Sequence, residues 1–355
     1  MTTGSIYVHI PFCAKKCPYC HFFVQPLQDV LLYLDGIKKE WALRKNSLNE
    51  IVSIYLGGGT PSLLSLSEIE EILTLFPKAE EITIEANPDD LTREKLAGYR
   101  ALGINRISIG VQSLDDSNLQ VIGRTHSAKK AKDGVLMAYA AGFDNISIDL
   151  MYDLPSQTFS TWKKTIDAAV ELPISHLSIY NLIFEEGSAY YKRKPLVPPE
   201  EESLKMLEYA VLKCEKGGLN RYEISAFCRD NKESLHNTGY WLGRSFIGLG
   251  PSAFSYMDGS RFRNICHLKK WHTALVSGTD PSDFRETLSY RDSIHELLAV
   301  RLRLMRGTSL KNIPPETLAI LDSLAEQGFL HKTPTHASLS EKGKLFYDLV
   351  ASEII

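Results

Sequence analysis

A short β-branched strand followed by a helix recurs through the first half of this chain, and this alternation constrains the fold most. Helical segments are indicated by apolar spacings of three and four in residues 27–45, by Ser67 with Glu70 as a capping box, by the stretch after Thr92, and by residues 128–141 ending at Gly142. The predicted strands cover residues 6–10, 53–56, 81–85, 106–109, 145–150 and 176–180. Most are near-continuous apolar runs, typical of strands buried on both faces. Six such units in about 180 residues predict a parallel α/β sheet, doubly wound or closed as a barrel.

The rhythm changes after Tyr191, where a Lys/Arg/Pro-rich stretch precedes a predicted helix over residues 200–216. Residues 221–265 are rich in glycine and aromatic side chains, and we expect them to be irregular. From about Thr287 the pattern is mostly helical and ends as helix, hairpin and helix, which is a winged-helix-like order. We therefore predict an α/β domain over 1–230, a connecting segment over 231–285 and a smaller helical domain over 286–355.

Composition excludes several classes of protein. The 355 residues carry a net charge of −3, so no global positive field exists to collect nucleic acid. The last forty or so residues carry both charge signs, so the winged-helix-like end does not indicate DNA binding. No apolar run approaches the roughly 18 residues of a membrane span, and no secretory signal is evident. We expect a soluble, cytoplasmic protein without stable membrane insertion.

Three of the six cysteines lie within eight positions, at Cys13, Cys17 and Cys20. In a reducing compartment such a cluster indicates metal or redox chemistry rather than a disulfide. A closed zinc site needs four ligands, and adjacent residues such as Cys20 and His21 rarely bind one metal. Three unrelated thiols are the other alternative. A three-cysteine cradle suits a [4Fe–4S] cluster with one iron left open to a small molecule.

Polar or glycine-rich residues follow the predicted strands, at the sheet edge where parallel α/β folds place their sites. Gly57 to Pro61 follows the second strand, and alone this segment indicates only a tight turn. Glu85 and Asp149 end two other strands, and Gln112 and Arg124 follow a third. A binding site for an amino acid and a ribose needs a cation for the carboxylate and hydrogen-bond acceptors for the hydroxyl groups. Asp149 is hard to explain by packing, because burying an unpaired carboxylate is costly.

These motifs together resemble a known family. The segment 7–20, YVHIPFCAKKCPYC, resembles the opening of radical S-adenosylmethionine (SAM) enzymes and, more closely, of the oxygen-independent coproporphyrinogen III oxidase group. Further segments match that group in order, over essentially the whole chain: 57–61, 84–88, 110–113, 123–126 and 149–155. The resemblance implies a partial (β/α)6 radical SAM barrel with a smaller, helical, winged-helix-like C-terminal domain.

The resemblance also implies cofactors and their ligands. Cys13, Cys17 and Cys20 would hold the [4Fe–4S] cluster, and SAM would chelate the open iron. A reductant such as a flavodoxin or ferredoxin would supply the electron. The positions that match SAM contacts are Tyr7, Tyr19, Gly58, Gly59, Thr60, Glu85, Gln112, Arg124, Asp149 and Ile183.

The group divides into oxidases and heme chaperones, and three features favour the chaperone branch. Phe22 stands where the oxidases have a fourth cysteine, and only six residues precede Tyr7, whereas the oxidases carry a longer extension. Residues 236–241, HNTGYW, match a motif associated with heme binding, which implies contacts from His236, Tyr240 and Trp241. Read from the residues alone, the motif is more typical of an aromatic packing cluster whose histidine makes a hydrogen bond. We expect a protein that binds heme and delivers it to an acceptor hemoprotein; the alternative is a coproporphyrinogen III oxidase.

Overall fold

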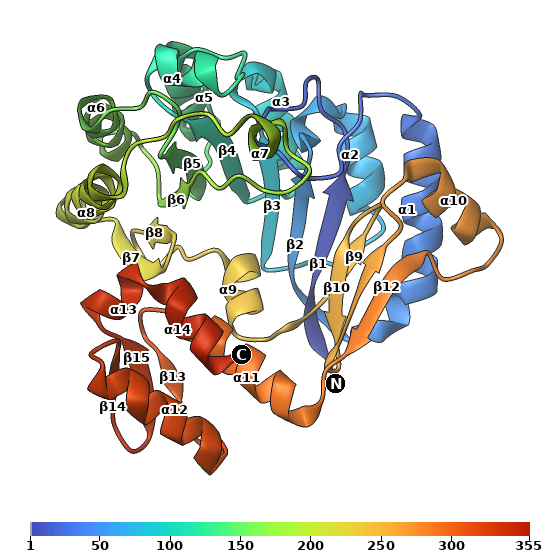
Figure 1. The fold of residues 1–355 in the computed structure, drawn as a ribbon. Helices are drawn as coiled ribbons and strands as arrows, with labels where there is room; N and C mark the ends of the chain where they lie inside the picture. Colours follow the sequence, from blue (N-terminus) through green and yellow to red (C-terminus); the bar gives the residue numbers. More distant parts are fainter. Residues whose placement is uncertain (1) are drawn as a thin grey trace.

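The computed structural model describes residues 2–355, and its core is a parallel sheet (Figure 1). Six strands pair in chain order with parallel register, and Ile6, Val8 and Ile10 of the first are fully buried. These strands are β1 (Thr3–Ile10), β2 (Glu50–Gly58), β3 (Glu81–Ala86), β4 (Arg106–Gln112), β5 (Ile146–Tyr152) and β6 (His176–Asn181). The predicted α/β fold, a partial barrel, is confirmed.

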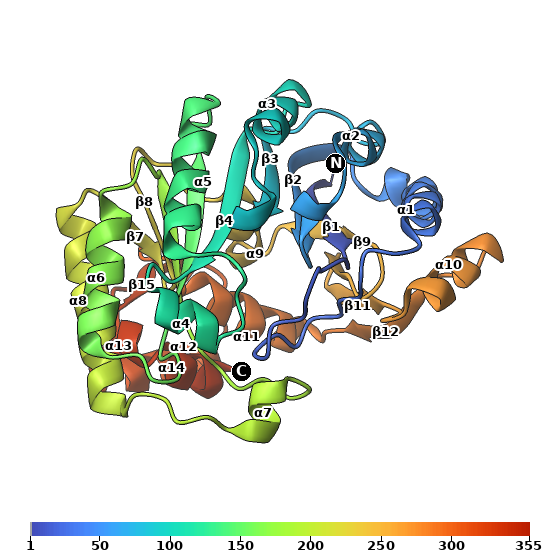
Figure 2. The same ribbon diagram turned by 90° about the horizontal axis from the view of Figure 1, so that it is seen from above.

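Helices cover the outer face of this curved sheet, as the view from above shows (Figure 2). They are α1 (Val30–Arg44), α2 (Leu66–Leu73), α3 (Arg93–Ala101), α4 (Asp116–Val121), α5 (Ala128–Ala140), α6 (Phe159–Val170) and α8 (Glu200–Lys216), with a short α7 (Ala189–Arg193) at the strand ends. The predicted capping box at Ser67 and Glu70 is wrong: Ser65 caps α2 and Glu68 returns the bond. Both serine–glutamate pairs have the spacing of a capping box. The helix begins at Leu66, and its buried residues are Ile69 and Ile72.

The segment after α8 is not irregular, and that prediction is wrong. It contributes β7 (Asn220–Glu223) and β8 (Ala226–Cys228) beyond β6, and at the opposite end β9 (Ser245–Leu249) pairs in parallel with β1. An antiparallel run of β10 (Phe254–Met257), β11 (Ser260–Asn264) and β12 (Ser282–Thr287) completes a 12-stranded sheet. These strands are short, and β7 and β10 to β12 mix polar, charged and aromatic residues, so most of them lack the apolar runs of the central strands. The expected connecting segment therefore extends the main sheet.

The C-terminal residues form a smaller unit with its own apolar core (Figure 1). It contains α11 (Tyr290–Arg301), β13 (Thr308–Ser309), α12 (Pro315–Glu326), β14 (Leu330–Lys332), β15 (His336–Leu339), α13 (Glu341–Leu345) and α14 (Tyr347–Ile354). These four helices and the small three-stranded sheet give the predicted winged-helix-like arrangement. Arg303 contacts Glu223 of β7 at 3.1 Å and ties this unit to the main sheet. Within residues 2–355, no helix is long and apolar enough to cross a membrane.

A buried carboxylate fastens the sheet extension to the barrel. Glu40 of α1 is fully buried and accepts four hydrogen bonds. One comes from Arg44 on the same helix at 3.1 Å. The others come from Asn264 of β11 at 2.7 Å, the Gly250 backbone at 2.8 Å, and Trp271 of α10 (Leu268–Val276) at 3.1 Å. Because every donor is buried with it, the loss of this carboxylate leaves several polar groups unpaired.

Replacing Glu40 should therefore destabilise the protein far more than replacing a surface glutamate. Glu40→Ala is expected to lower the free energy of unfolding by about 3–5 kcal/mol, the usual effect of breaking a buried ionic cluster. The control is Glu71→Ala, which removes an exposed ion pair with Lys38 and should change stability by less than about 1 kcal/mol. Urea denaturation at neutral pH measures both. Equal effects of the two substitutions would contradict the role given to Glu40.

Candidate functional site

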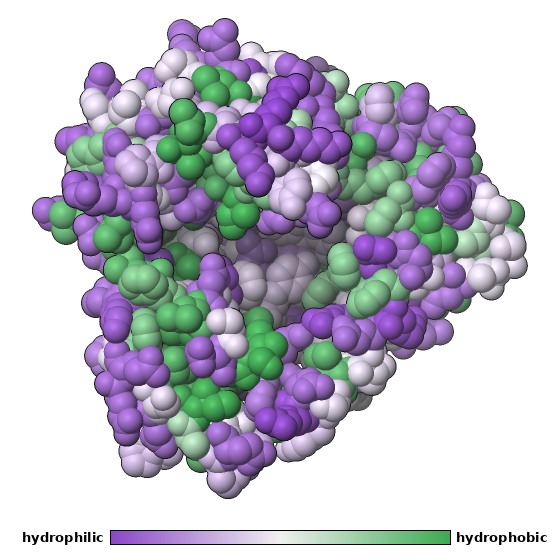
Figure 3. All heavy atoms as spheres, in the orientation of Figure 1, coloured by the Kyte–Doolittle hydropathy of each residue, from purple (hydrophilic) through white to green (hydrophobic). Residues whose placement is uncertain are grey.

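Two adjacent cavities open at the C-terminal end of the central strands. The cysteine cavity, about 600 Å³, is lined by Cys13, Cys17, Cys20 and the ends of β2 to β6. The aromatic cavity, about 870 Å³, is lined by aromatic side chains of α9 (Leu235–Trp241), β9 and β10 and by two arginines of β11. Figure 3 shows this face of the molecule hollowed between the barrel, the C-terminal unit and the sheet extension. Four residues line both cavities: Lys16, His21, Phe22 and Val24. The loop after β1 is thus a shared wall.

Backbone hydrogen bonds hold this loop in place. The Cys13 amide donates to the Gln25 carbonyl at 2.9 Å, and the Gln25 amide donates to Pro11 at 2.7 Å. The amide of Gly59, in the loop after β2, donates to the Ile10 carbonyl at 2.8 Å. A Cβ at position 59 would lie 2.6 Å from the Phe12 carbonyl oxygen, so only glycine permits this close approach. The two loops therefore form one rigid cradle.

The three thiols face the cysteine cavity among polar groups. Cys13 Sγ lies 3.4 Å from the Thr60 hydroxyl, and Arg124 Nη1 lies 3.9 Å from Cys17 Sγ. Burial raises the pKa of the Cys13 and Cys20 thiols, so a bound cation would be needed to keep them as thiolates.

The residues fit an iron–sulfur cluster with an open iron. In the described chain, no three cysteine, histidine or carboxylate side chains converge on a single metal ion. A cluster does not require such convergence, because each thiolate binds a different iron. Arg124 Nε is buried without a hydrogen-bond partner, although its Nη2 donates to the Gly110 carbonyl at 2.8 Å. That unpaired donor points to an additional anionic or polar group in the cavity.

Two half-buried carboxylates, Glu85 and Asp149, also line the cysteine cavity. Glu85 accepts a hydrogen bond from the Tyr55 hydroxyl at 2.8 Å and another from the Gly58 amide at 3.1 Å. Asp149 accepts from the Ser108 hydroxyl at 3.3 Å. Burial raises the pKa of Glu85 to about 7, and repulsion by Asp149 adds to the effect. Burial likewise raises the pKa of Asp149. Both groups are acceptors for the hydroxyl or amino groups of a ligand.

The structure gathers most residues that the resemblance assigned to SAM. Nine of the ten line the cysteine cavity: Tyr19, Gly58, Gly59, Thr60, Glu85, Gln112, Arg124, Asp149 and Ile183. The tenth, Tyr7, lies instead in the wall of the aromatic cavity, where its hydroxyl is 3.1 Å from His9 Nδ1.

The HNTGYW motif forms helix α9 and divides its side chains between core and cavity. His236 is buried, with Nδ1 2.9 Å from the Ser53 hydroxyl and Nε2 2.7 Å from the Tyr240 hydroxyl. Burial lowers the pKa of His236 to about 3, so the ring is neutral. Tyr240 and Trp241 line the aromatic cavity. His236 lines neither cavity in the part of the chain that the structure describes. His236 would have to release Tyr240 before its Nε2 could bind a metal.

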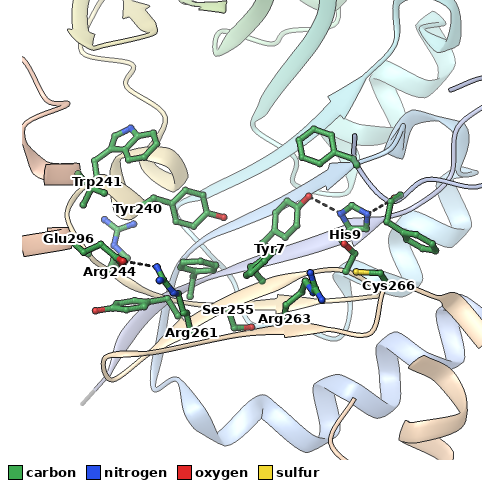
Figure 4. A pocket seen from close by; sticks show the side chains of 18 of the residues that line it. Tyr7, His9, Tyr240, Trp241, Arg244, Ser255, Arg261, Arg263, Cys266 and Glu296 are labelled. Carbon is green, nitrogen blue, oxygen red and sulfur yellow. Dashed lines mark hydrogen bonds and ion pairs between the residues drawn. The ribbon is translucent and has the colours of Figure 1, made fainter. Parts of the chain in front are cut away.

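Sequence reasoning missed the cationic part of the aromatic cavity. Arg244 follows α9, and Arg261 and Arg263 project from β11 (Figure 4). Alternation of Arg261 and Arg263 around the buried Phe262 is a strand signal that places both arginines on one face. The sequence does not show that Arg244 lines the same cavity as these two arginines, because α9 and β11 come together only in the folded protein.

Comparison with known proteins identifies the family. The model of the radical SAM superfamily matches residues 7–169. The heme chaperone HemW of Bacillus subtilis is 33% identical, with 96% of each chain covered. The chain belongs to the HemW family of radical SAM proteins. HemW of Escherichia coli is 30% identical, with 96% of this chain and 95% of that protein covered.

The fold agrees with that of a solved family structure. Coproporphyrinogen III oxidase (HemN) from Escherichia coli, described as a radical SAM enzyme, superposes with a TM-score of 0.86. The match covers 99% of this chain and 90% of that chain at 23% identity. This chain and the oxidase therefore share one fold, and the fold alone does not decide the function.

The raised pKa of Glu85 predicts a pH dependence of stability. Between about pH 4.5 and 7, the folded state keeps a proton that the unfolded state has lost, so stability falls as pH rises through this range. Glu85→Gln should remove this contribution. The difference in unfolding free energy between wild type and variant should change by on the order of 2 kcal/mol across the range. Denaturation at pH 4.5, 6 and 7.5 measures it, and a pH-independent difference would contradict the assignment.

Proposed function

We propose that this HemW-family protein is a heme chaperone. It binds a [4Fe–4S] cluster and SAM in the cysteine cavity and heme in the aromatic cavity, and transfers the heme to an acceptor hemoprotein. The observation that carries the proposal is the pair of cavities that share the loop from Lys16 to Val24 as a wall.

On one side of this wall, Cys13, Cys17 and Cys20 hold the cluster through three of its irons. When bound and reduced by a flavodoxin- or ferredoxin-type donor, the cluster supplies an electron to SAM. Arg124, with its unpaired Nε, receives the SAM carboxylate. Glu85 and Asp149 accept hydrogen bonds from its hydroxyl or amino groups, and Gly58 and Gly59 leave room for close approach. The cradle thus orients SAM against the open iron.

On the other side, the aromatic cavity offers the flat apolar surface that a macrocycle needs. Tyr240, Trp241, Phe246 and Phe254 contribute to its lining. Its volume of about 870 Å³ lies within the range of cofactor sites. In this proposal Tyr240 and Trp241 contact the heme, while His236 holds the Tyr240 hydroxyl. The histidine of the motif then contributes by positioning its neighbour.

Phe22 favours the chaperone over the oxidase. It occupies the position where oxidases of the resembling group have a fourth cysteine, and it is 53% exposed in the shared wall. An exposed phenylalanine there presents an apolar ring to the aromatic cavity rather than a fourth thiol. The HemW relatives are themselves named heme chaperones.

The cluster assignment predicts a cysteine-specific loss of iron. Cys17→Ser should lose most of the bound iron and sulfide after anaerobic reconstitution, because one of three protein ligands is gone. Cys214→Ser is the matched control, because Cys214 lies on the buried face of α8 and does not line the cysteine cavity. Iron and sulfide analysis with electron paramagnetic resonance checks both. Wild-type cluster content in Cys17→Ser would refute the cluster site.

The function itself is tested by two readouts on one anaerobic preparation. Wild type should bind heme and pass it to an apo-hemoprotein, and should leave coproporphyrinogen III unchanged while a true oxidase run in parallel converts it. Tyr240→Leu should weaken heme binding roughly tenfold, because an aromatic face and its packing are lost. Tyr139→Leu, an exposed tyrosine on α5, should bind heme as wild type does. Protoporphyrinogen formation at the oxidase's rate would overturn the proposal.

A further inference from the structure

The aromatic cavity is positively charged, although the protein as a whole carries a net charge of −3. Four cationic side chains line it, and Glu296 is the one carboxylate among its described lining residues. The cations are Lys16, Arg244, Arg261 and Arg263. An apolar cavity with an excess of cations suits a ligand that is apolar in its body and anionic at its edge.

The arginines differ in how far their charge is already neutralised. Arg261 pairs with Glu286 at 2.7 Å and with Glu296 at 2.6 Å. Arg263 pairs with Asp283 at 3.0 Å. Within residues 2–355, no carboxylate lies within ion-pair distance of Arg244. Arg244 thus lines the cavity with a charge that no ion pair among the described residues neutralises.

The backbone around Arg244 is arranged to hold its guanidinium. Nη1 donates to the Leu235 carbonyl at 3.1 Å and lies 3.5 Å from the Ser5 hydroxyl. A Cβ at Gly239, inside the HNTGYW motif, would lie 2.9 Å from Nη1 and 3.2 Å from the central carbon of the group. The glycine of the motif therefore leaves the space that the guanidinium fills. Nη1 is used for positioning, and Nη2 makes no hydrogen bond within residues 2–355, while Arg244 lines the cavity.

Figure 4 places Arg244 at one end of the cavity, beside Trp241, Arg261 and Glu296, with His9 and Cys266 at the other end. We propose that Arg244 binds a propionate carboxylate of the porphyrin, and so fixes which edge of the macrocycle enters this end. This inference rests on the proposed function and names the residue that recognises the ligand's charge. Arginine suits the role, because its planar fork matches a carboxylate.

The test compares hemin with hemin dimethyl ester, which has the same ring and no carboxylate charge. Both are titrated into wild type, Arg244→Gln, Arg244→Lys and the control Arg285→Gln in one detergent-containing buffer. Arg285 lies on β12, outside the cavity lining. Wild type and Arg285→Gln should bind hemin more tightly than the ester. Arg244→Gln should bind hemin roughly tenfold to hundredfold more weakly and the ester unchanged. Arg244→Lys should recover part of the preference for hemin.

The outcomes separate this inference from the proposed function. If Arg244→Gln keeps the wild-type preference for hemin over its ester, the inference is overturned while heme binding stands. If the variant loses affinity for both ligands equally, Arg244 acts only by supporting α9, and the inference is again overturned. If wild type binds neither ligand, the proposed heme site itself fails.

Discussion

The parallel pairing of β1 with two neighbours, β2 on one side and β9 on the other, is the constraint on which the rest of the structure depends. A strand bonded on both edges and buried on both faces cannot shift register without exposing its apolar side chains. The loop that leaves its C-terminal end is therefore fixed. Since β2 brings the glycine loop and β9 brings the walls of the aromatic cavity, both cavities take their positions from β1.

The two cavities communicate through side chains as well as through the shared loop. Tyr55 donates to Glu85 at 2.8 Å in the cysteine cavity, and its ring lies 4.9 Å from that of His236. His236 in turn holds Tyr240, which faces the aromatic cavity. A ligand that moves Glu85 thus acts on a continuous set of packed aromatic rings reaching the second cavity. Under the proposed function, this contiguity is a physical route between the ligand sites of the two cavities.

Sequence patterns predicted the residues whose roles depend on local order. The three cysteines are close in the chain, and each strand of the parallel sheet delivers its terminal residue to the same edge, so the cysteine cavity was largely readable in advance. Tyr7 was the exception, because it lies three residues before the C-terminal end of β1 and lines the aromatic cavity instead of the cysteine cavity. The capping box at Ser65 was missed because a second serine–glutamate pair has the same spacing two residues later.

The sequence by itself determined the α/β alternation, the thiol cradle and the motif that carries Tyr240 and Trp241, because these depend on neighbours along the chain. Only the tertiary structure decided that residues 245–287 would extend the sheet, that His236 would turn inward to Ser53, and that Arg244 would have no ion-pair partner among residues 2–355. Each of those outcomes depends on a partner far away in the sequence. Burial and charge pairing between distant residues follow from the dense packing of the whole folded chain, which no local sequence pattern specifies.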